Sequence, residues 1–258
     1  MSDLKENSVD PSTSRPKSKF KFFIEQVGQL VFALLIVFAI RSSVVEPFKI
    51  PSGSMIPTLF VGDFIFVNKF AYSFKLPFSD LFGKAVSLVD RDPPKRGDVI
   101  VFLYPKDTGV HYIKRVIGLP GDRVRVQDKV LFINDQKMEQ TEVPLEVKEK
   151  TLSAVGDPRY GSDHMHMFKE NLMTEEHMLF TDANNDYTSN FDEITVPANH
   201  LFVMGDNRDF SNDSRFWGYV PFENIAGRAE VIWLSLWVNF ENPSTSTFKP
   251  GRIGTLLR

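Results

Sequence analysis

The apolar run from Val27 to Ile40 is the feature that most constrains what this chain can fold into. Gln29 is its one polar side chain, and Arg41 ends it. A membrane-spanning helix needs about 20 apolar residues, so this run is short, but a start at Phe22 brings it close to that length. The basic residues before it are Arg15, Lys17, Lys19 and Lys21. A basic cluster followed by an apolar run leaves three interpretations open.

The first interpretation, a cleaved signal peptide, requires a cleavage site of the A-x-A type, which residues 41–45 match poorly. The second, a buried core helix, is unusual for a segment that is apolar on every face. We therefore predict the third, an uncleaved transmembrane anchor over residues 22–41. Because basic residues stay on the cytoplasmic side, residues 1–21 are expected to form a cytoplasmic polar and basic tail, with the rest of the chain facing outward.

Beyond this segment the pattern changes to short strands separated by turn signals such as Gly62-Asp63 and Pro120-Gly121-Asp122. This spacing predicts a mainly β fold, an antiparallel and barrel-like β domain built from residues 42–137 and 191–258. Residues 138–190 are more polar and less periodic, so we predict an inserted smaller lobe of hairpins and loops. The expected strands are 44–50, 64–67, 98–104, 112–118, 122–127, 130–133, 193–197, 201–204 and 229–238.

The composition excludes several classes of site. With 30 Lys and Arg against 33 Asp and Glu, the chain has no global charge that predicts a nucleic-acid partner. It has no cysteine, which excludes disulfides, thiolate zinc sites and a cysteine nucleophile. His164 and His166 alone are a weak metal signal, since no further ligands stand near them in sequence. We predict no metal and no cofactor.

The ten residues from Ile50 to Leu59 combine two serines, one glycine and two prolines. Proline fixes the backbone and glycine widens its choices, so the stretch is either an ordinary turn or a rigid loop that presents a hydroxyl group. A serine nucleophile also needs a base. The five histidines follow no Ser-Asp pattern, which gives a Ser-His-Asp triad little support.

A lysine is the other base that a serine can use, provided that its amine is neutral. At its ordinary pKa about one lysine in a thousand is neutral near pH 7.4, but burial among apolar groups lowers the pKa by up to several units. Lys114 lies in an apolar strand, on the same face as Tyr112 and Val116. Periodicity alone still favours a solvated lysine whose stem packs across its neighbours.

Four segments, in a fixed order along the chain, decide between these alternatives. They are Pro51–Met55 with Pro57-Thr58-Leu59; Gly62-Asp63 with Val67-Asn68-Lys69; Arg96–Phe102 with Lys114–Asp122; and Gly205–Arg208 with Ser211, Asp213, Ser214, Arg215 and Gly218. This ordered set resembles the boxes of the bacterial type I signal peptidases, membrane-anchored Ser/Lys endopeptidases that remove signal peptides from exported proteins. The resemblance covers most of residues 44–238 apart from the lobe at 138–190, which matches no box.

The resemblance implies a role for each matched residue. Ser54 is the implied nucleophile and Lys114 the general base, while the Ser54 N–H and the Ser52 hydroxyl form the oxyanion hole. Ser211 is expected to orient the Lys114 amine. Asp213 and Arg215 are expected to pair as structural support. The positions that match the walls of pockets for small side chains at P1 and P3 are Phe48, Ile50, Val101, Tyr112 and Ile113.

The family also implies partners and a location. Exported preproteins that carry signal peptides are the expected substrates, the lipid bilayer and the export machinery are the expected neighbours, and no nucleic acid is expected. The implied location is the bacterial cytoplasmic membrane, crossed once, with the catalytic domain on the outer side. Two alternatives are a self-cleaving Ser/Lys repressor, which requires an N-terminal DNA-binding domain, and a membrane-anchored scaffold with a dead protease site.

Overall fold

The structure of this chain is a computed structural model that describes residues 19–75, 87–173, 175–239 and 246–257. The helices are α1 (Lys19–Ser43), α2 (Leu145–Val155) and α3 (Ser214–Trp217), with short 3-10 helices η1 (Lys69–Ala71), η3 (Arg208–Phe210), η4 (Phe222–Asn224) and η6 (Pro250–Arg252). The strands are β1 (Val45–Lys49), β2 (Asp63–Asn68), β3 (Ser73–Lys75), β4 (Ser87–Asp90), β5 (Val99–Tyr104), β6 (Asp107–Gly118), β7 (Arg123–Gln127), β8 (Val130–Ile133), β9 (Gln136–Lys137), β10 (Gln140–Glu142), β11 (Met165–Asn171), β12 (Glu176–Asp182), β13 (Phe191–Thr195), β14 (His200–Met204), β15 (Val220–Pro221), β16 (Ile225–Trp237) and β17 (Thr247–Phe248).

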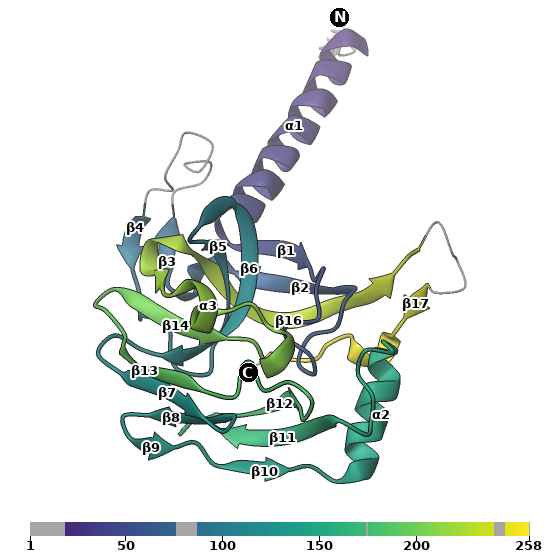
Figure 1. Cartoon of the computed structure of the whole chain (residues 1–258). Helices are drawn as coiled ribbons and strands as arrows, with labels where there is room; N and C mark the ends of the chain where they lie inside the picture. Colours follow the sequence, from purple (N-terminus) through teal and green to yellow (C-terminus); the bar gives the residue numbers. More distant parts are fainter. Residues whose placement is uncertain (1–18, 76–86, 174, 240–245, 258) are drawn as a thin grey trace, which may run out of the picture. The chain divides into compact units, whose positions relative to one another are not determined.

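The largest sheet of the described chain has the strand order β1-β2-β16-β5-β6-β14-β15, and β17 pairs with β16 (Figure 1). Its strand pairs are antiparallel, which confirms the prediction of a mainly antiparallel β fold. The prediction of a barrel-like domain is wrong, because the sheet is open: β1 and β15 are its two edge strands and do not pair with each other. Strand β15 is only two residues long and ends at Pro221, whose nitrogen has no hydrogen to donate to a further strand.

Strand β6 lies between β5 and β14 in this sheet. In its register Lys114 is opposite Ile100 of β5, and Arg115 is opposite Met204 at the end of β14. The sheet therefore brings the predicted lysine box beside residues 205–208, which follow β14 directly. These two segments are about 90 residues apart in the sequence, so only the strand pairing places them together.

The chain divides into two compact units, residues 1–40 and 41–258, and most of helix α1 belongs to the first. Its described side chains, at 21–37, are all exposed. Among the residues that the structure describes, no helix is both long enough and apolar enough to cross a membrane. The predicted helix is present, and its membrane-spanning role stays a prediction.

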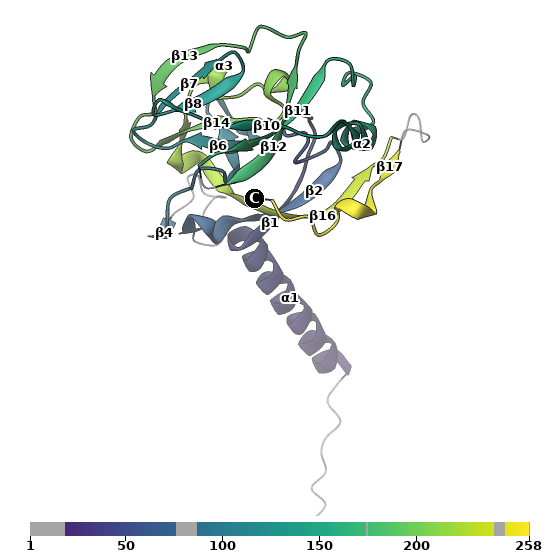
Figure 2. The same ribbon diagram turned by 90° about the horizontal axis from the view of Figure 1, so that it is seen from below.

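Residues 138–190, which we call the lobe, contain more regular structure than the loops and hairpins predicted for them. Strands β10, β11 and β12 form a three-stranded sheet, and α2 lies beside its end (Figure 2). Helix α2 ends at Gly156, whose left-handed backbone (φ 71°) suits a residue without a side chain. A second small sheet has the order β13-β7-β8-β9. The division into a β domain and an inserted lobe stays a prediction.

Two apolar clusters hold residues 50–59, which we call the Ser54 loop. The first joins the loop to the main sheet, and its members include Ile50, Met55, Leu59, Ile65 and Val101. The second joins the same loop to the lobe, and its members include Ile56, Phe60, Leu152, Met167 and Phe180. Burial of one such side chain stabilises the fold by roughly 2 kcal/mol, so the loop is fixed from two sides by apolar contacts.

Candidate active site

Asn207, which lies just after β14, holds the loop backbone at Ser54. The Asn207 amide nitrogen donates to the Ser54 carbonyl oxygen at 3.1 Å, and the Asn207 side chain donates to the Gly53 carbonyl oxygen at 3.0 Å. Met55 next to it is fully buried, while Ser54 itself keeps 8% of its surface exposed. The loop therefore anchors its apolar side chains in the core and leaves the Ser54 hydroxyl group at the surface of a cleft.

Lys114 brings its amine directly to that hydroxyl group. The Lys114 Nζ lies 2.7 Å from the Ser54 Oγ and donates a second hydrogen bond to the Ile113 carbonyl oxygen at 2.8 Å. The ring of Tyr112 lies 5.4 Å from the same nitrogen. Only 4% of Lys114 is exposed, so the solvated lysine that periodicity favours is wrong. The Ser54 loop and the Tyr112 ring lie against the amine and cover it.

Burial lowers the pKa of Lys114 from 10.5 to about 8, although the negative charges of Asp213 and Asp206 oppose that change. At pH 7.4 this raises the neutral fraction of the amine from roughly one in a thousand to about a fifth. A neutral amine at 2.7 Å has a lone pair that can accept the hydroxyl proton. The pair therefore has the distance, burial and basicity that a Ser/Lys hydrolytic site requires.

Asp213 and Arg215 form the ion pair that the sequence predicted as support. The Arg215 guanidinium donates to both Asp213 oxygens at 2.9 Å, and the Gly205 N–H donates to Asp213 Oδ2 at 3.0 Å. Burial raises the pKa of Asp213, but the Arg215 charge and these hydrogen bonds outweigh it and hold that pKa below its usual range. Asp213 thus stays charged inside the protein.

Ser211 lies in this region, and its role in orienting the amine stays a prediction. Its side chain is buried, yet no hydrogen bond joins these two described residues, because the Lys114 amine is directed at Ser54 and the Ile113 carbonyl. Gly205 lies against both serines, and a Cβ there would overlap the Ser211 hydroxyl and the Ser54 carbonyl oxygen. Glycine at this position allows the close approach of the two segments.

A cleft of about 1060 Å³ opens over the Ser54–Lys114 pair. Of the predicted contact residues, Ser52, Tyr112 and Ile113 line it. Phe48, Ile50 and Val101 are not among the lining residues; they belong to the apolar cluster beneath, where Ile50 and Val101 are each only 2% exposed. The lobe supplies residues 153–160 of the lining, a contribution that the sequence analysis left unassigned.

Two ion pairs beside the Ser54 loop were missed from the sequence. The first joins Arg115, next to Lys114, to Asp206 through hydrogen bonds of 2.8 Å at both carboxylate oxygens. The second joins Arg252 near the C-terminus to Asp63, and Arg252 also donates to the Thr58 carbonyl oxygen at 2.9 Å. Each charge is visible in the sequence, but no local pattern says which partner it meets.

The two histidines of the weak metal signal face different partners. His164 Nδ1 lies 2.9 Å from Asp182 Oδ1, and His166 Nδ1 lies 3.0 Å from Glu142 Oε1. Within the described ranges no group of three or more potential ligands is placed to hold a metal ion.

Comparison with known proteins gives the family to which the chain belongs. The family model for signal peptidase, peptidase S26, matches residues 23–234. A signal peptidase I of Pseudomonas aeruginosa is 41% identical over 89% of this chain and 78% of its own length. A signal peptidase I of Pseudomonas fluorescens is 46% identical over 81% of this chain and 72% of its own length. The chain therefore belongs to the signal peptidase family, peptidase S26.

Among solved structures, a signal peptidase I from Enterococcus faecalis V583 is 30% identical over 53% of this chain and 97% of that chain. Its TM-score of 0.32 is too low to bear on the fold. Family membership rests on the sequence matches, and it makes this chain a serine endopeptidase of the signal-peptide-processing class.

Proposed function

We propose that this chain cleaves N-terminal signal peptides from exported preproteins with Ser54 as nucleophile and Lys114 as general base. The observation that carries the proposal is the 2.7 Å contact between the Lys114 amine and the Ser54 hydroxyl, both of them buried. Family membership supplies the reaction class. The contact supplies the two groups that a nucleophilic mechanism needs within hydrogen-bonding reach.

In the proposed mechanism the neutral Lys114 amine takes the proton of the Ser54 hydroxyl as its oxygen attacks the scissile carbonyl carbon. The resulting oxyanion accepts hydrogen bonds from the Ser54 N–H and the Ser52 hydroxyl, each worth about 3 kcal/mol in the transition state. Lys114 then returns the proton to the leaving amine, and an acyl-enzyme remains on Ser54. A water molecule, deprotonated by the same amine, hydrolyses that ester.

Small side chains at P1 and P3 of the preprotein are the proposed specificity. Tyr112 and Ile113 line the cleft beside Lys114, while Phe48, Ile50 and Val101 lie beneath it as a packed apolar layer. Because this layer is already filled, the floor of the cleft beside Lys114 leaves little room for a large side chain. The same apolar layer keeps water from the Lys114 amine.

The proposal includes a location in the cytoplasmic membrane, for which the support comes from the sequence. The basic residues before the apolar stretch favour a cytoplasmic N-terminus, with residues 22–41 in the membrane and the catalytic residues on its outer face, near the bilayer and the export machinery. Extraction of cell membranes with alkaline carbonate tests it. Release of the full chain into the soluble fraction would contradict an integral anchor.

The function is tested with the full chain purified in detergent and a preprotein that carries a signal peptide. Ser54→Ala and Lys114→Ala should each abolish cleavage. The matched controls are the same substitutions at an exposed serine and an exposed lysine, Ser162→Ala and Lys137→Ala, which should leave the rate unchanged. Cleavage that survives either substitution at the site would refute the assigned roles. A folded wild-type chain that cleaves nothing would favour a scaffold with a dead site.

A further inference from the structure

Three consecutive residues after β14 connect three parts of the molecule. The Asp206 carboxylate binds Arg115 on the lysine strand and accepts from the Thr58 hydroxyl of the Ser54 loop. Asn207 holds the Gly53 and Ser54 carbonyl oxygens, as described above. Arg208 turns the opposite way, into the lobe. The relative position of Ser54 and Lys114 therefore depends on where residues 206–208 are held.

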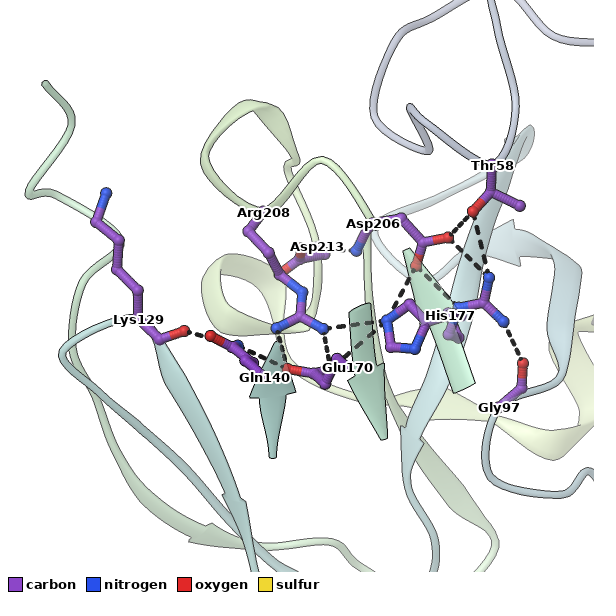
Figure 3. Close-up of polar contacts among 11 residues, drawn as sticks. Thr58, Gly97, Lys129, Gln140, Glu170, His177, Asp206, Arg208 and Asp213 are labelled. Carbon is purple, nitrogen blue, oxygen red and sulfur yellow. Dashed lines mark hydrogen bonds and ion pairs between the residues drawn. The ribbon is translucent and has the colours of Figure 1, made fainter. Parts of the chain in front are cut away.

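The lobe holds them by one backbone contact and one buried side-chain cluster. The Phe180 N–H on β12 donates to the Asp206 carbonyl oxygen at 2.9 Å. Both terminal nitrogens of the Arg208 guanidinium donate hydrogen bonds to the Glu170 carboxylate on β11, one of them at 3.0 Å. His177 on β12 completes the cluster, with its Nε2 3.3 Å from Arg208 Nη2, 3.5 Å from the Glu170 carboxylate and 3.7 Å from the Asp206 carboxylate (Figure 3).

The protonation of His177 is fixed by its surroundings. Burial lowers its pKa to about 4, and the nearby positive charge of Arg115 adds to that effect. The imidazole is therefore neutral at pH 7, and because Arg208 can only donate, the His177 Nε2 must accept. His177 thus binds the guanidinium as an acceptor, between the Glu170 and Asp206 carboxylates.

We propose that His177 and Glu170 of the lobe are positioning residues for the hydrolytic site, acting through Arg208 and Asp206 on the contact between Ser54 and Lys114. This inference rests on the proposed function. Neither His177 nor Glu170 lines the cleft, so they do not bind substrate. A displacement of about 1 Å in a reacting group can lower the rate by about a hundredfold, so a loosened cluster should lower kcat and leave KM nearly unchanged.

The test measures kcat and KM of the full chain with a preprotein substrate, per folded molecule. His177→Leu keeps the bulk but removes the acceptor, and we expect kcat to fall about tenfold or more with KM within about twofold. His177→Gln offers an amide oxygen to Arg208 and should recover part of the loss. The matched control is His166→Leu on the neighbouring strand β11, whose imidazole is exposed and pairs with Glu142; its kcat should stay within about twofold of wild type.

A milder variant keeps the inference testable if His177→Leu does not fold. Gln140 on β10 is half-buried and donates to Glu170 Oε1 at 2.9 Å, so Gln140→Met removes one support of the cluster. We expect a two- to fivefold lower kcat, again without a change in KM.

Three results would overturn the inference: an unchanged kcat in folded His177→Leu or Gln140→Met, an equal loss in the His166→Leu control, or no recovery by His177→Gln. Failure of the proposed function looks different, because then the wild type does not cleave or Ser54→Ala cleaves equally well. A merely structural role for the lobe would lower the melting temperature and leave kcat per folded molecule at the wild-type value.

Discussion

The basicity of Lys114 is the quantity on which the proposed chemistry depends, and the pH dependence of cleavage measures it. A pKa of about 8 instead of 10.5 corresponds to about 3 kcal/mol against the charged amine. Only the neutral amine accepts the Ser54 proton, so kcat/KM should rise about tenfold per pH unit up to about pH 8 and level off above it. Initial rates of preprotein cleavage between pH 6 and pH 10.5 give the profile.

The same cost of burying the charged Lys114 amine, which favours catalysis, should lower the stability of the folded protein. Below pH 8 the folded and unfolded chains both carry the proton, and the buried ammonium costs the folded state up to about 3 kcal/mol. Between pH 8 and 10.5 only the unfolded state stays protonated, so the free energy of unfolding rises with pH. Lys114→Met should therefore be inactive but more stable than wild type at pH 7, with a gap that narrows toward pH 10.5.

Lost bonds to Ser54 and to the Ile113 carbonyl reduce that gain by about 1 kcal/mol each at either pH, so the change in the stability difference between pH 7 and pH 10 is the sharper readout. Denaturant unfolding at pH 7 and pH 10 measures it. A rate profile that still rises steeply above pH 10 would refute the claim that burial makes Lys114 a base near neutral pH. So would a Lys114→Met variant whose stability relative to wild type does not change between the two pH values.

Three further predictions concern the surroundings of the pair. Gly205→Ala places a Cβ against the Ser54 carbonyl oxygen and should lower both the melting temperature and the cleavage rate; an unaffected rate would contradict the close approach. Arg252→Met leaves the Asp63 carboxylate buried without its cation and should lower the free energy of unfolding by about 3 kcal/mol in denaturant titrations, whereas a change below about 1 kcal/mol would show the pair to be dispensable. His177, whose folded pKa is about 4, stays neutral while the unfolded chain takes up a proton, so stability should fall by up to about 3 kcal/mol from pH 6.5 to pH 4, and His177→Gln should flatten that fall.

The main sheet was largely predictable from local pattern. Alternating and apolar runs between turn signals identified β5, β6 and β14 to within a few residues, because side chains along a strand alternate between two faces. Helix α2 was missed, since its eleven residues carry four charges and little apolar periodicity. The open edge of the sheet was also missed, because closure depends on which end strands meet in space and not on the number of strands.

The site was predictable only through the ordered boxes and not through local chemistry. Periodicity treats Lys114 as an ordinary strand lysine, and nothing near it in sequence marks it as buried. Ser211 makes no hydrogen bond to the Lys114 amine among the described residues, and the residues that hold the Ser54 loop come from segments as distant as Asn207 and Arg252. Ion pairs between distant segments produce no periodic pattern in the sequence, so only the fold shows which residues pair.

By itself, the sequence determined the β character of the chain, the order of its boxes and the two residues proposed to react. The tertiary structure decided whether those residues are able to react. Ser54 and Lys114 are 60 positions apart, and their contact at 2.7 Å exists because an interior strand, a clamped loop and a lobe meet there. The same packing excludes water from the amine and so lowers its pKa, and that burial is a property of neighbours in space that no stretch of sequence carries.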